Sequence, residues 1–569
     1  MSKQTSPPRL ATVSTNEKYD PSGHETVSPK GGADGDVLAD LGYKQELKRG
    51  FSTLENFGIS FSIISVITGI TTQFAFGLSN GGPGVMSVGW IIVSFFTIIV
   101  ALAMSEVVSA VPTSGGPYHW AALLTRPSHS PFAAYSTGFF NLLGQAAVTA
   151  GIVYGCSGLI ATLASLHGFE VTAAREVGIS AALLVFGGIV NTFGIKFLAI
   201  LNRASIALHS AGVFSIVVAL LVKAPSYRTA KEVFGTFNDA SGWSERASPA
   251  YVALTGILVA QYTQTGFDAS AHMSEETENA AVNAPRGVLM SVAVSAVFGF
   301  FVLVSFLFCA QPDVADSSVG QPVLQIFIDA FGTTGATVAF SIIIICVILC
   351  GTFSLTSNSR MYFSCARDSL IPRFFSVVNE RFASPVRTVW LAVVLALILI
   401  LPALGSTVAF AAVTAIATSG LYISYALPVV FRLIENERFL SIRGPFYLGR
   451  FSRPIALICV LYVSFITIVF CLPTVTPVDS QTLNYTPIAL GIVATYIVVS
   501  WFAFARKTFH GPRADALKEA SRVLGENANA VNQLEREVTT DSMAVKRKMD
   551  GVDTRVKAVD TIEVGQEYK

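Results

Sequence analysis

Uncharged apolar stretches recur along the chain and are separated by short polar loops. A helix needs about 20 residues to cross ~30 Å of hydrocarbon. The ninth and tenth stretches share one uncharged run, which we divide at Pro402-Ala-Leu-Gly-Ser406 because the run is about twice the length that one span needs. The pattern predicts an all-α membrane protein with twelve spans, near residues 57–78, 84–105, 131–161, 177–195, 204–222, 248–270, 287–310, 330–358, 388–404, 408–430, 454–473 and 484–505.

Polar residues and glycine interrupt two of these spans. The first interruption is Ile67-Thr68-Gly69-Ile70-Thr71-Thr72, and the second runs from Thr265 to Glu276. An ionised carboxylate such as Asp268 costs at least roughly 3 kcal/mol at the bilayer centre. Unwound backbone is tolerated at that depth only where it lines a cavity or binds a ligand. We therefore predict two discontinuous helices whose breaks face each other and form one substrate site.

The chemistry of such breaks indicates the substrate. Amide groups at the start of a half-helix suit a carboxylate, and free carbonyls at its end suit an ammonium, so a zwitterionic amino acid satisfies both. In the second break we expect Gly266 to be the bend, Phe267 a lid or specificity wall, and Asp268 an ammonium partner or a protonatable group. The candidate substrate-binding residues are Thr68, Gly69, Ile70, Thr71, Thr72, Gln73, Tyr262, Gln264, Gly266, Phe267 and Asp268.

Each break also has a purely structural interpretation. Thr68 to Thr72 are small residues of the kind that pack membrane helices together, and Asp268 can cap the restarted half-helix through its backbone amides. His209 lies well inside the fifth span and titrates in a range that suits proton coupling, as an alternative to Asp268, or it is a hydrogen-bonded structural histidine. Glu275, Glu276 and Glu278 are predicted to form a solvated acidic face at the cytoplasmic end.

Composition supports the membrane assignment and excludes other classes. The chain is 52% hydrophobic and 13% charged, with a mean hydropathy of +0.58, whereas soluble domains are roughly one-quarter charged. A net charge of +1 gives no basis for nucleic-acid binding. The cysteines have no metal-ligand or disulfide spacing, and Walker, Cys-x-x-C and His-Glu-x-x-His motifs are absent from the sequence. We therefore expect no metal, no cofactor and no enzymatic activity.

Basic residues near the span ends predict the orientation. Five arginines follow the eighth span and five follow the tenth, so we place both loops and both termini in the cytoplasm. The loop from Lys223 to Arg246 also carries basic residues and counts against this arrangement. Residues 1–48 are predicted to be a disordered cytoplasmic tail, 49–506 the transporter domain, and 507–569 a C-terminal cytoplasmic tail. Solvated tails of this kind can engage trafficking or ubiquitylation machinery.

Three motifs carry a resemblance to a known family. They are Glu106 to Trp120, Phe267 to Thr277 followed by Ala284-Pro-Arg-Gly-Val288, and Asn358 to Pro372. In this order across twelve spans they resemble signatures of the amino acid–polyamine–organocation superfamily. The pattern is most similar to its amino acid/choline transporter branch, which includes GABA permeases, and the resemblance covers roughly residues 45 to 506.

The resemblance implies two inverted five-helix repeats plus two extra helices, with substrate held at broken helices 1 and 6 and moved by alternating access. It implies that Thr68 to Thr72 bind the substrate carboxylate and that Phe267 and Asp268 gate and orient the substrate, usually with a proton gradient. We expect a plasma-membrane, rather than vacuolar, carrier of GABA or a related amino acid. The alternatives are a polyamine carrier, a choline carrier with an aromatic cage of Phe267, Tyr262 and Phe74, or an amino acid sensor without net transport.

Overall fold

The computed structural model describes residues 46–512, apart from 48, 313, 315–318, 406–408 and 481. The predicted N-terminal tail and nearly all of the C-terminal tail therefore lie outside the described residues. Within the described part of the chain the protein is helical, and its few β-bridges are isolated. The all-α prediction is confirmed.

Eleven of the predicted spans are helices that are long and apolar enough to cross a membrane within the described residues. They are α2 and α3 (Thr53–Ile64 and Val66–Ser79), α4 (Gly82–Ala110), α6 (Ser130–Ser165), α7 (Ala173–Thr192), α8 to α9 (Ile195–Ala207 and Val213–Lys223), α14 (Ala280–Cys309), α15 (Pro322–Arg367), α16 (Val386–Ile400), α17 (Ala409–Ile434), α19 (Ser452–Val469) and α20 (Thr486–Ser500). The sixth predicted span is instead divided into α11 (Pro249–Gly256), α12 (Leu258–Thr263) and α13 (Ala269–His272).

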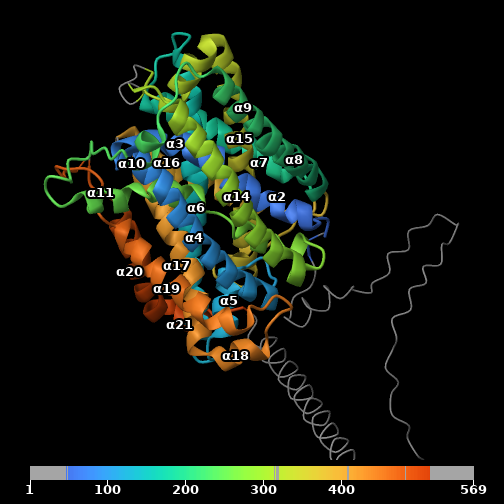
Figure 1. Ribbon diagram of the computed structural model, residues 1–569. Helices are drawn as coiled ribbons and strands as arrows, with labels where there is room; N and C mark the ends of the chain where they lie inside the picture. The colour runs from blue at the N-terminus through green and yellow to red at the C-terminus, as the bar shows by residue number, and fades with distance from the viewer. Residues whose placement is uncertain are drawn as a thin grey trace, which may run out of the picture.

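Short elements connect these helices. They are α5 (Pro117–Leu124), α10 (Ala230–Gly235), α18 (Asn436–Ser441) and α21 (Arg506–Thr508), with the π-helical turns η1 (Leu208–Gly212) and η7 (Trp501–Ala505) and the 3-10 turns η2 (Ser274–Glu276), η4 (Arg373–Phe375), η5 (Leu401–Leu404) and η6 (Gly449–Phe451). Figure 1 shows one bundle with α5 and α18 at its lower end. We call the face reached by the ends of α15 and α17 the arginine-rich face.

Close backbone approach holds the bundle together, since lipid gives helices little hydrophobic reason to associate. The helix α17 packs against α6 at Gly144 and Gly420, where an added Cβ on Gly420 would lie 3.1 Å from the Cα of Gly144. The helix α14 packs against α4, and Trp90 donates from Nε1 to the carbonyl of Ala296 at 2.9 Å. Large apolar side chains such as Phe502 point outward, as expected for a surface that faces lipid.

Several boundaries differ from the prediction. The helix α15 starts at Pro322 but is kinked at Gly332, which has a φ of 67°, so a short helical segment precedes the part that follows the predicted start near residue 330. The divided apolar run is confirmed, because η5 follows α16 and a new helix starts at Ala409. Hydropathy marks only the part of a helix that lies in hydrocarbon, so polar or protein-covered ends extend beyond it.

Candidate functional site

The first break lies at Ser65, where the chain adopts a left-handed conformation with φ 32° and ψ 71° between α2 and α3. The prediction that Thr68 to Thr72 form the break is wrong, because these residues lie inside α3. Thr72 donates to the carbonyl of Thr68 at 2.9 Å, which lets a threonine sit inside a helix. The Ser65 hydroxyl bonds Nε2 of His209 at 2.8 Å and also contacts the Thr68 hydroxyl.

The second break lies where the sequence predicts it. α12 ends at Thr263 and α13 begins at Ala269, and Gly266 between them has a φ of 94°, which a residue with a side chain rarely adopts. A Cβ on Gly266 would lie 2.6 Å from Cγ2 of Ile63, near the end of α2. A Cβ on Gly69 of α3 would lie 2.3 Å from Oγ1 of Thr263 on α12. The two breaks therefore lie against each other.

A small cavity of about 20 Å³ lies between the breaks. Residues from α2, α3, α6, α12, α15 and the second break line it: Ile63, Ile64, Thr68, Gly69, Val148, Ile152, Tyr262, Thr263, Thr265 and Cys350. This volume holds about one water molecule. The cavity thus contains three of the predicted site residues, in a conformation too closed for an amino acid.

Other predicted site residues lie outside this lining. Ile70 is buried in the core, and the carbonyl of Thr71 accepts from Gln321 at 2.7 Å. Gln264 donates to Ser94 at 2.9 Å, whereas the side-chain amide nitrogen of Gln73 is buried without a hydrogen bond among the described residues. The small-residue interpretation describes Gly69 well, because Gly69 permits the close contact between α3 and α12.

Aromatic rings cover the second break from α17. Phe267 is fully buried, and its ring centroid lies 6.2 Å from that of Tyr422 and 5.2 Å from that of Tyr425. Its carbonyl accepts from the hydroxyl of Ser60 on α2 at 3.0 Å. Phe267 therefore joins the second break to both α2 and α17.

Asp268 does not cap α13, because its side chain makes no capping hydrogen bond. Its Oδ2 instead accepts from Nε2 of Gln145 on α6 at 2.7 Å and lies 3.2 Å from Nε2 of His272. Its Oδ1 is buried without a hydrogen bond among the described residues, and Tyr425 lies beside the same carboxyl group. Asp268 thus keeps one oxygen for a further partner.

His209 is held between neutral groups. It lies in η1, and its Nδ1 lies 2.9 Å from the carbonyl of Ser205 while its Nε2 contacts Ser65. One donor nitrogen and one acceptor nitrogen satisfy both contacts, so the neutral ring fits this place. The histidine supports the first break from η1.

Ion pairs close the arginine-rich face below the breaks. Arg367 forms a bidentate pair with Glu275 at 2.9 and 3.0 Å, and Arg360 pairs with Glu276 at 2.7 Å. Both glutamates are buried, so the prediction of a solvated acidic face is wrong for them, and only Glu278 is exposed. Each buried glutamate stays ionised because an arginine that lies far away in the sequence pairs with it.

The three sequence motifs meet at this face. The amide of Ser114, in the loop before α5, donates to Glu275 at 3.2 Å, and the carbonyl of Ser114 lies 2.8 Å from Nδ1 of His272. His119 on α5 lies 3.1 Å from Oδ2 of Asp368, which follows α15. The motifs therefore form one buried polar network directly below the second break.

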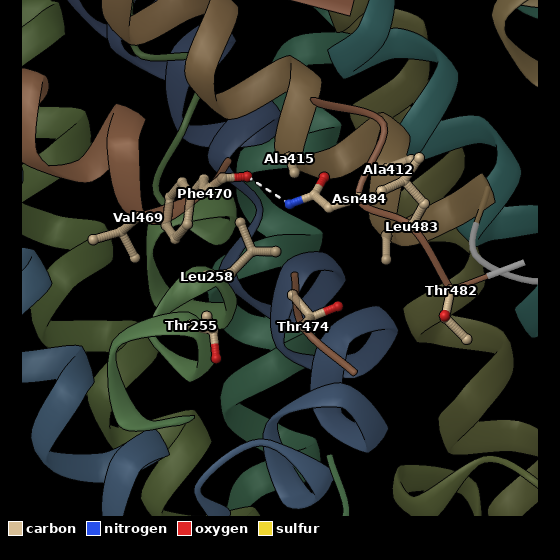
Figure 2. A pocket seen from close by; sticks show the side chains of 11 residues that line it. Thr255, Leu258, Ala412, Ala415, Val469, Phe470, Thr474, Thr482, Leu483 and Asn484 are labelled. Carbon is tan, nitrogen blue, oxygen red and sulfur yellow. Dashed lines mark hydrogen bonds between the residues drawn. The ribbon is translucent and has the colours of Figure 1, made fainter. Parts of the chain in front are cut away.

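The opposite face is closed by the segment between α19 and α20. A second cavity, of about 20 Å³, lies at this face. Figure 2 shows Thr255 and Leu258 on one side of it and Phe470 and Asn484 on the other. The side-chain amide of Asn484 donates to the carbonyls of Phe470 and Leu472, each at 2.8 Å. This segment lies over α11 and α12, the part of the broken helix on the side opposite the arginine-rich face.

A loop before α11 adds to that closure. The amide of Gly81 donates to the carbonyl of Asn238 at 2.8 Å, which ties the loop to the turn between α3 and α4. Burial raises the pKa of Asp239, but hydrogen bonds from Ser241 and Ser244 outweigh this effect and lower the pKa to about 2. The carboxylate therefore stays ionised and organises the loop at any physiological pH.

Four residues of this region were not predicted as site residues: Ser65, Gln145, His272 and Cys350. Gln145 was recognisable as a polar residue inside a span, and His272 as a histidine one helical turn after Asp268. Cys350 lines the cavity and donates to the carbonyl of Ile63 at 3.1 Å. Its neighbours in the sequence are apolar and do not indicate this position.

Comparisons with known proteins agree with this architecture. Residues 51–495 match the family model described as amino acid permease. Among similar proteins, the amino-acid permease BAT1 homolog of Oryza sativa subsp. japonica is 38% identical over 84% of this chain and 94% of its own length, and amino-acid permease BAT1 of Arabidopsis thaliana is 37% identical over 84% and 96%. The GABA-specific permease of Saccharomyces cerevisiae is 32% identical over 84% of this chain and 86% of its own length.

The family match spans both broken helices and the three motifs that meet at the arginine-rich face. The apolar helices and the closed cavity between two breaks suit a carrier rather than an enzyme. This chain is an integral, multi-pass membrane protein that belongs to the amino acid permease family.

Proposed function

We propose that this protein is a secondary transporter that carries GABA or a related small amino acid into the cytoplasm by alternating access, with protons as the coupling ion. The observation that carries this proposal is the cavity between two broken helices, closed on both faces by buried contacts. A site that is sealed on both sides between two gates is what alternating access requires.

The start of α3 suits the substrate carboxylate. Val66 and Ile67 begin this helix after the break at Ser65, and the first amides of a helix have no acceptor within it. Thr68 and Gly69 line the cavity at the same end. The helix dipole adds a partial positive charge there, so a carboxylate is favoured without a basic side chain.

The second break suits the substrate ammonium. Thr265 lines the cavity, and Asp268 follows it with one oxygen that accepts no hydrogen bond from the part of the chain that the structure describes. An ammonium that reaches this oxygen gains a charged partner in a site without bulk water. In this proposal Phe267 is the wall that sets substrate size, and Gly266 gives the bend.

Choline is the main alternative substrate, and the aromatic groups it needs are not assembled in this conformation. Phe74 packs against Phe306 with ring centroids 6.2 Å apart, whereas Phe267 packs against Tyr422 and Tyr425. Tyr262 lines the cavity without either phenylalanine. A cation–π cage requires the rings to surround one point, so the geometry favours an amino acid.

In this proposal the arginine-rich face lies in the cytoplasm and the membrane is the plasma membrane, because arginines cluster in the two loops on that face. Arg360, Arg367 and Arg432 form buried ion pairs with glutamates, but the other arginines of the two loops remain as the topological signal. Both termini then lie on the same, cytoplasmic side, where the tails can meet trafficking or ubiquitylation machinery.

The test is uptake of labelled GABA and labelled protein amino acids into cells without their own permeases, at acidic and neutral external pH. Unlabelled choline and putrescine serve as competitors. We expect amino acid uptake that rises at acidic pH and is lost in Asp268→Asn. Uptake of choline without any amino acid would refute the carboxylate role of the α3 start, and amino acid binding without uptake would show a sensor.

A further inference from the structure

We infer that Asp268 and His272 share a single proton and that this is the coupling proton of transport. The inference deepens the proposed function, because it rests on proton-coupled carriage and names the groups that hold the proton. Both side chains are fully buried, one helical turn apart across α13, and Oδ2 of Asp268 lies 3.2 Å from Nε2 of His272.

The other ring nitrogen of His272 fixes where its first proton lies. Nδ1 lies 2.8 Å from the backbone carbonyl of Ser114. A carbonyl oxygen only accepts hydrogen bonds, so Nδ1 carries a proton and donates it. This leaves Nε2 as the nitrogen that faces the carboxyl group of Asp268.

The contact between Nε2 of His272 and Oδ2 of Asp268 needs one more proton. If Nε2 carries it, an imidazolium faces a carboxylate; if Oδ2 carries it, a carboxylic acid donates to a neutral imidazole. Without it, the lone pair of Nε2 faces a negatively charged oxygen and the two groups repel. The 3.2 Å contact fits a pair that holds one shared proton and is neutral overall.

The groups around Asp268 and His272 do not compete for this proton. From α6, the amide of Gln145 donates to Asp268, and from α17, Tyr425 lies beside the same carboxyl group. The nearby charged groups on the arginine-rich side have partners of their own: Glu275 pairs with Arg367, and His119 contacts Asp368. His209 differs because its two ring nitrogens face a carbonyl and a hydroxyl and no carboxylate.

Loss of the proton acts on the cytoplasmic gate. His272 holds the carbonyl of Ser114, and the amide of the same residue donates to Glu275. When the proton leaves toward the cytoplasm, Asp268 becomes a bare carboxylate and repels Nε2, so His272 must turn away and releases Ser114. A proton from the outer side restores the contact, so one proton is taken up and one is released in each cycle.

The test uses the full-length protein in proteoliposomes with an inward gradient of about 2 pH units. Each unit supports a tenfold concentration ratio at one proton per substrate, so the wild type accumulates substrate up to about 100-fold. Counterflow measured with the same pH on both sides of the membrane reports substrate exchange in the absence of a proton gradient. The probes are labelled GABA and the labelled protein amino acids, each taken in turn.

We expect His272→Gln to keep counterflow within about twofold of the wild type and to reduce gradient-driven accumulation to near unity. Gln retains a hydrogen-bond donor but exchanges no proton. The matched control, His209→Gln, is expected to keep the wild-type ratio of accumulation to counterflow, because His209 supports the first break and faces no carboxylate. A positioning role alone would lower counterflow and accumulation together and would leave the pH dependence of the remaining uptake unchanged.

Three results separate this inference from the proposed function. Accumulation that persists in His272→Gln but is lost in His209→Gln overturns the inference and leaves proton-coupled transport in place. Wild-type counterflow without gradient-driven accumulation overturns both the inference and the proton coupling. Absence of counterflow for every amino acid tested overturns the proposed function itself.

Discussion

Replacement of Gly69 by alanine tests whether the two broken helices must touch. An added Cβ would lie 2.3 Å from Oγ1, 2.7 Å from Cβ and 2.7 Å from Cγ2 of Thr263. Thr263 is β-branched and its hydroxyl donates to the carbonyl of Val259 at 2.6 Å, so it cannot simply rotate away. The contact must be relieved by moving α3 away from α12.

The expected size follows from two opposing effects. Alanine gains about 1 kcal/mol over glycine inside a helix, whereas overpacking of a close contact costs about 1–3 kcal/mol. For Gly69→Ala we expect a net loss of stability on the order of 1 kcal/mol. We also expect strongly reduced uptake, because the new methyl group occupies the wall of the cavity. Gly178→Ala is the matched control, since no atom lies within 4 Å of its added Cβ.

Two assays are needed. The first is thermal unfolding of the detergent-solubilised protein, monitored by size-exclusion chromatography after heating. The second is uptake normalised to surface expression. Gly69→Ala should unfold at a lower temperature than the wild type, and Gly178→Ala at the same or a higher temperature. Adding Thr263→Ala removes two of the three close atoms and should restore part of the loss. Wild-type stability and uptake in Gly69→Ala would refute the close approach of the two breaks.

Three further predictions concern the gates. Glu276→Gln leaves Arg360 buried without its anion, and we expect a loss of about 3–5 kcal/mol, measured as reduced surface expression and a lower unfolding temperature. Asn484→Ala leaves two carbonyls without a donor and should cost about 1–3 kcal/mol, while glycosidase treatment should leave the wild-type gel mobility unchanged, because the Asn484 amide is already engaged. Asp239→Asn should change uptake relative to the wild type by the same factor at pH 5 and at pH 7. The Asp239 carboxyl group has a pKa of about 2, so the stability that its ionised form contributes is fully present above the ordinary value of 3.8 and is lost only as the pH falls through about 2.

Controls accompany each of these changes. Glu278→Gln removes an exposed carboxylate next to the ion pairs and should have little effect, and adding Arg360→Met to Glu276→Gln should restore part of the loss. Asn484-Tyr485-Thr486 has the sequence of an N-glycosylation acceptor, and Thr486→Val removes this sequon without touching the side-chain amide of Asn484. Wild-type behaviour of Glu276→Gln, a mobility shift on deglycosylation, or an Asp239→Asn defect confined to pH 5 would contradict the corresponding prediction.

The sequence predicts the spans well because hydrocarbon imposes a length and an apolar composition on every helix that crosses it. It also locates the second break, because Gly266 and Asp268 reveal a positive φ and a charge within a few residues. The first break escapes such reasoning. Ser65 bends the chain through its contact with His209, and a single serine between isoleucine and valine does not indicate that distant partner.

The buried charges show the same limit more clearly. Glu275 and Glu276 look like a solvated end of a span until Arg367 and Arg360 are placed beside them by the packing of α13 against α15. The pairs are separated by some ninety residues in sequence, so no local pattern reveals them. Family resemblance brought these residues to attention as motifs, whereas their roles as partners required the three-dimensional contacts.

The brevity of α13 has a consequence for how the transporter fails. This helix is 4 residues long, so it rises about 6 Å between the Asp268 end and the gate. A change in the protonation of Asp268 therefore reaches the gate without a chain of other residues, because both ends of α13 move as one rigid body. Leak and loss of accumulation should therefore arise from the same substitutions, and slippage without gate damage should be rare in any collection of variants.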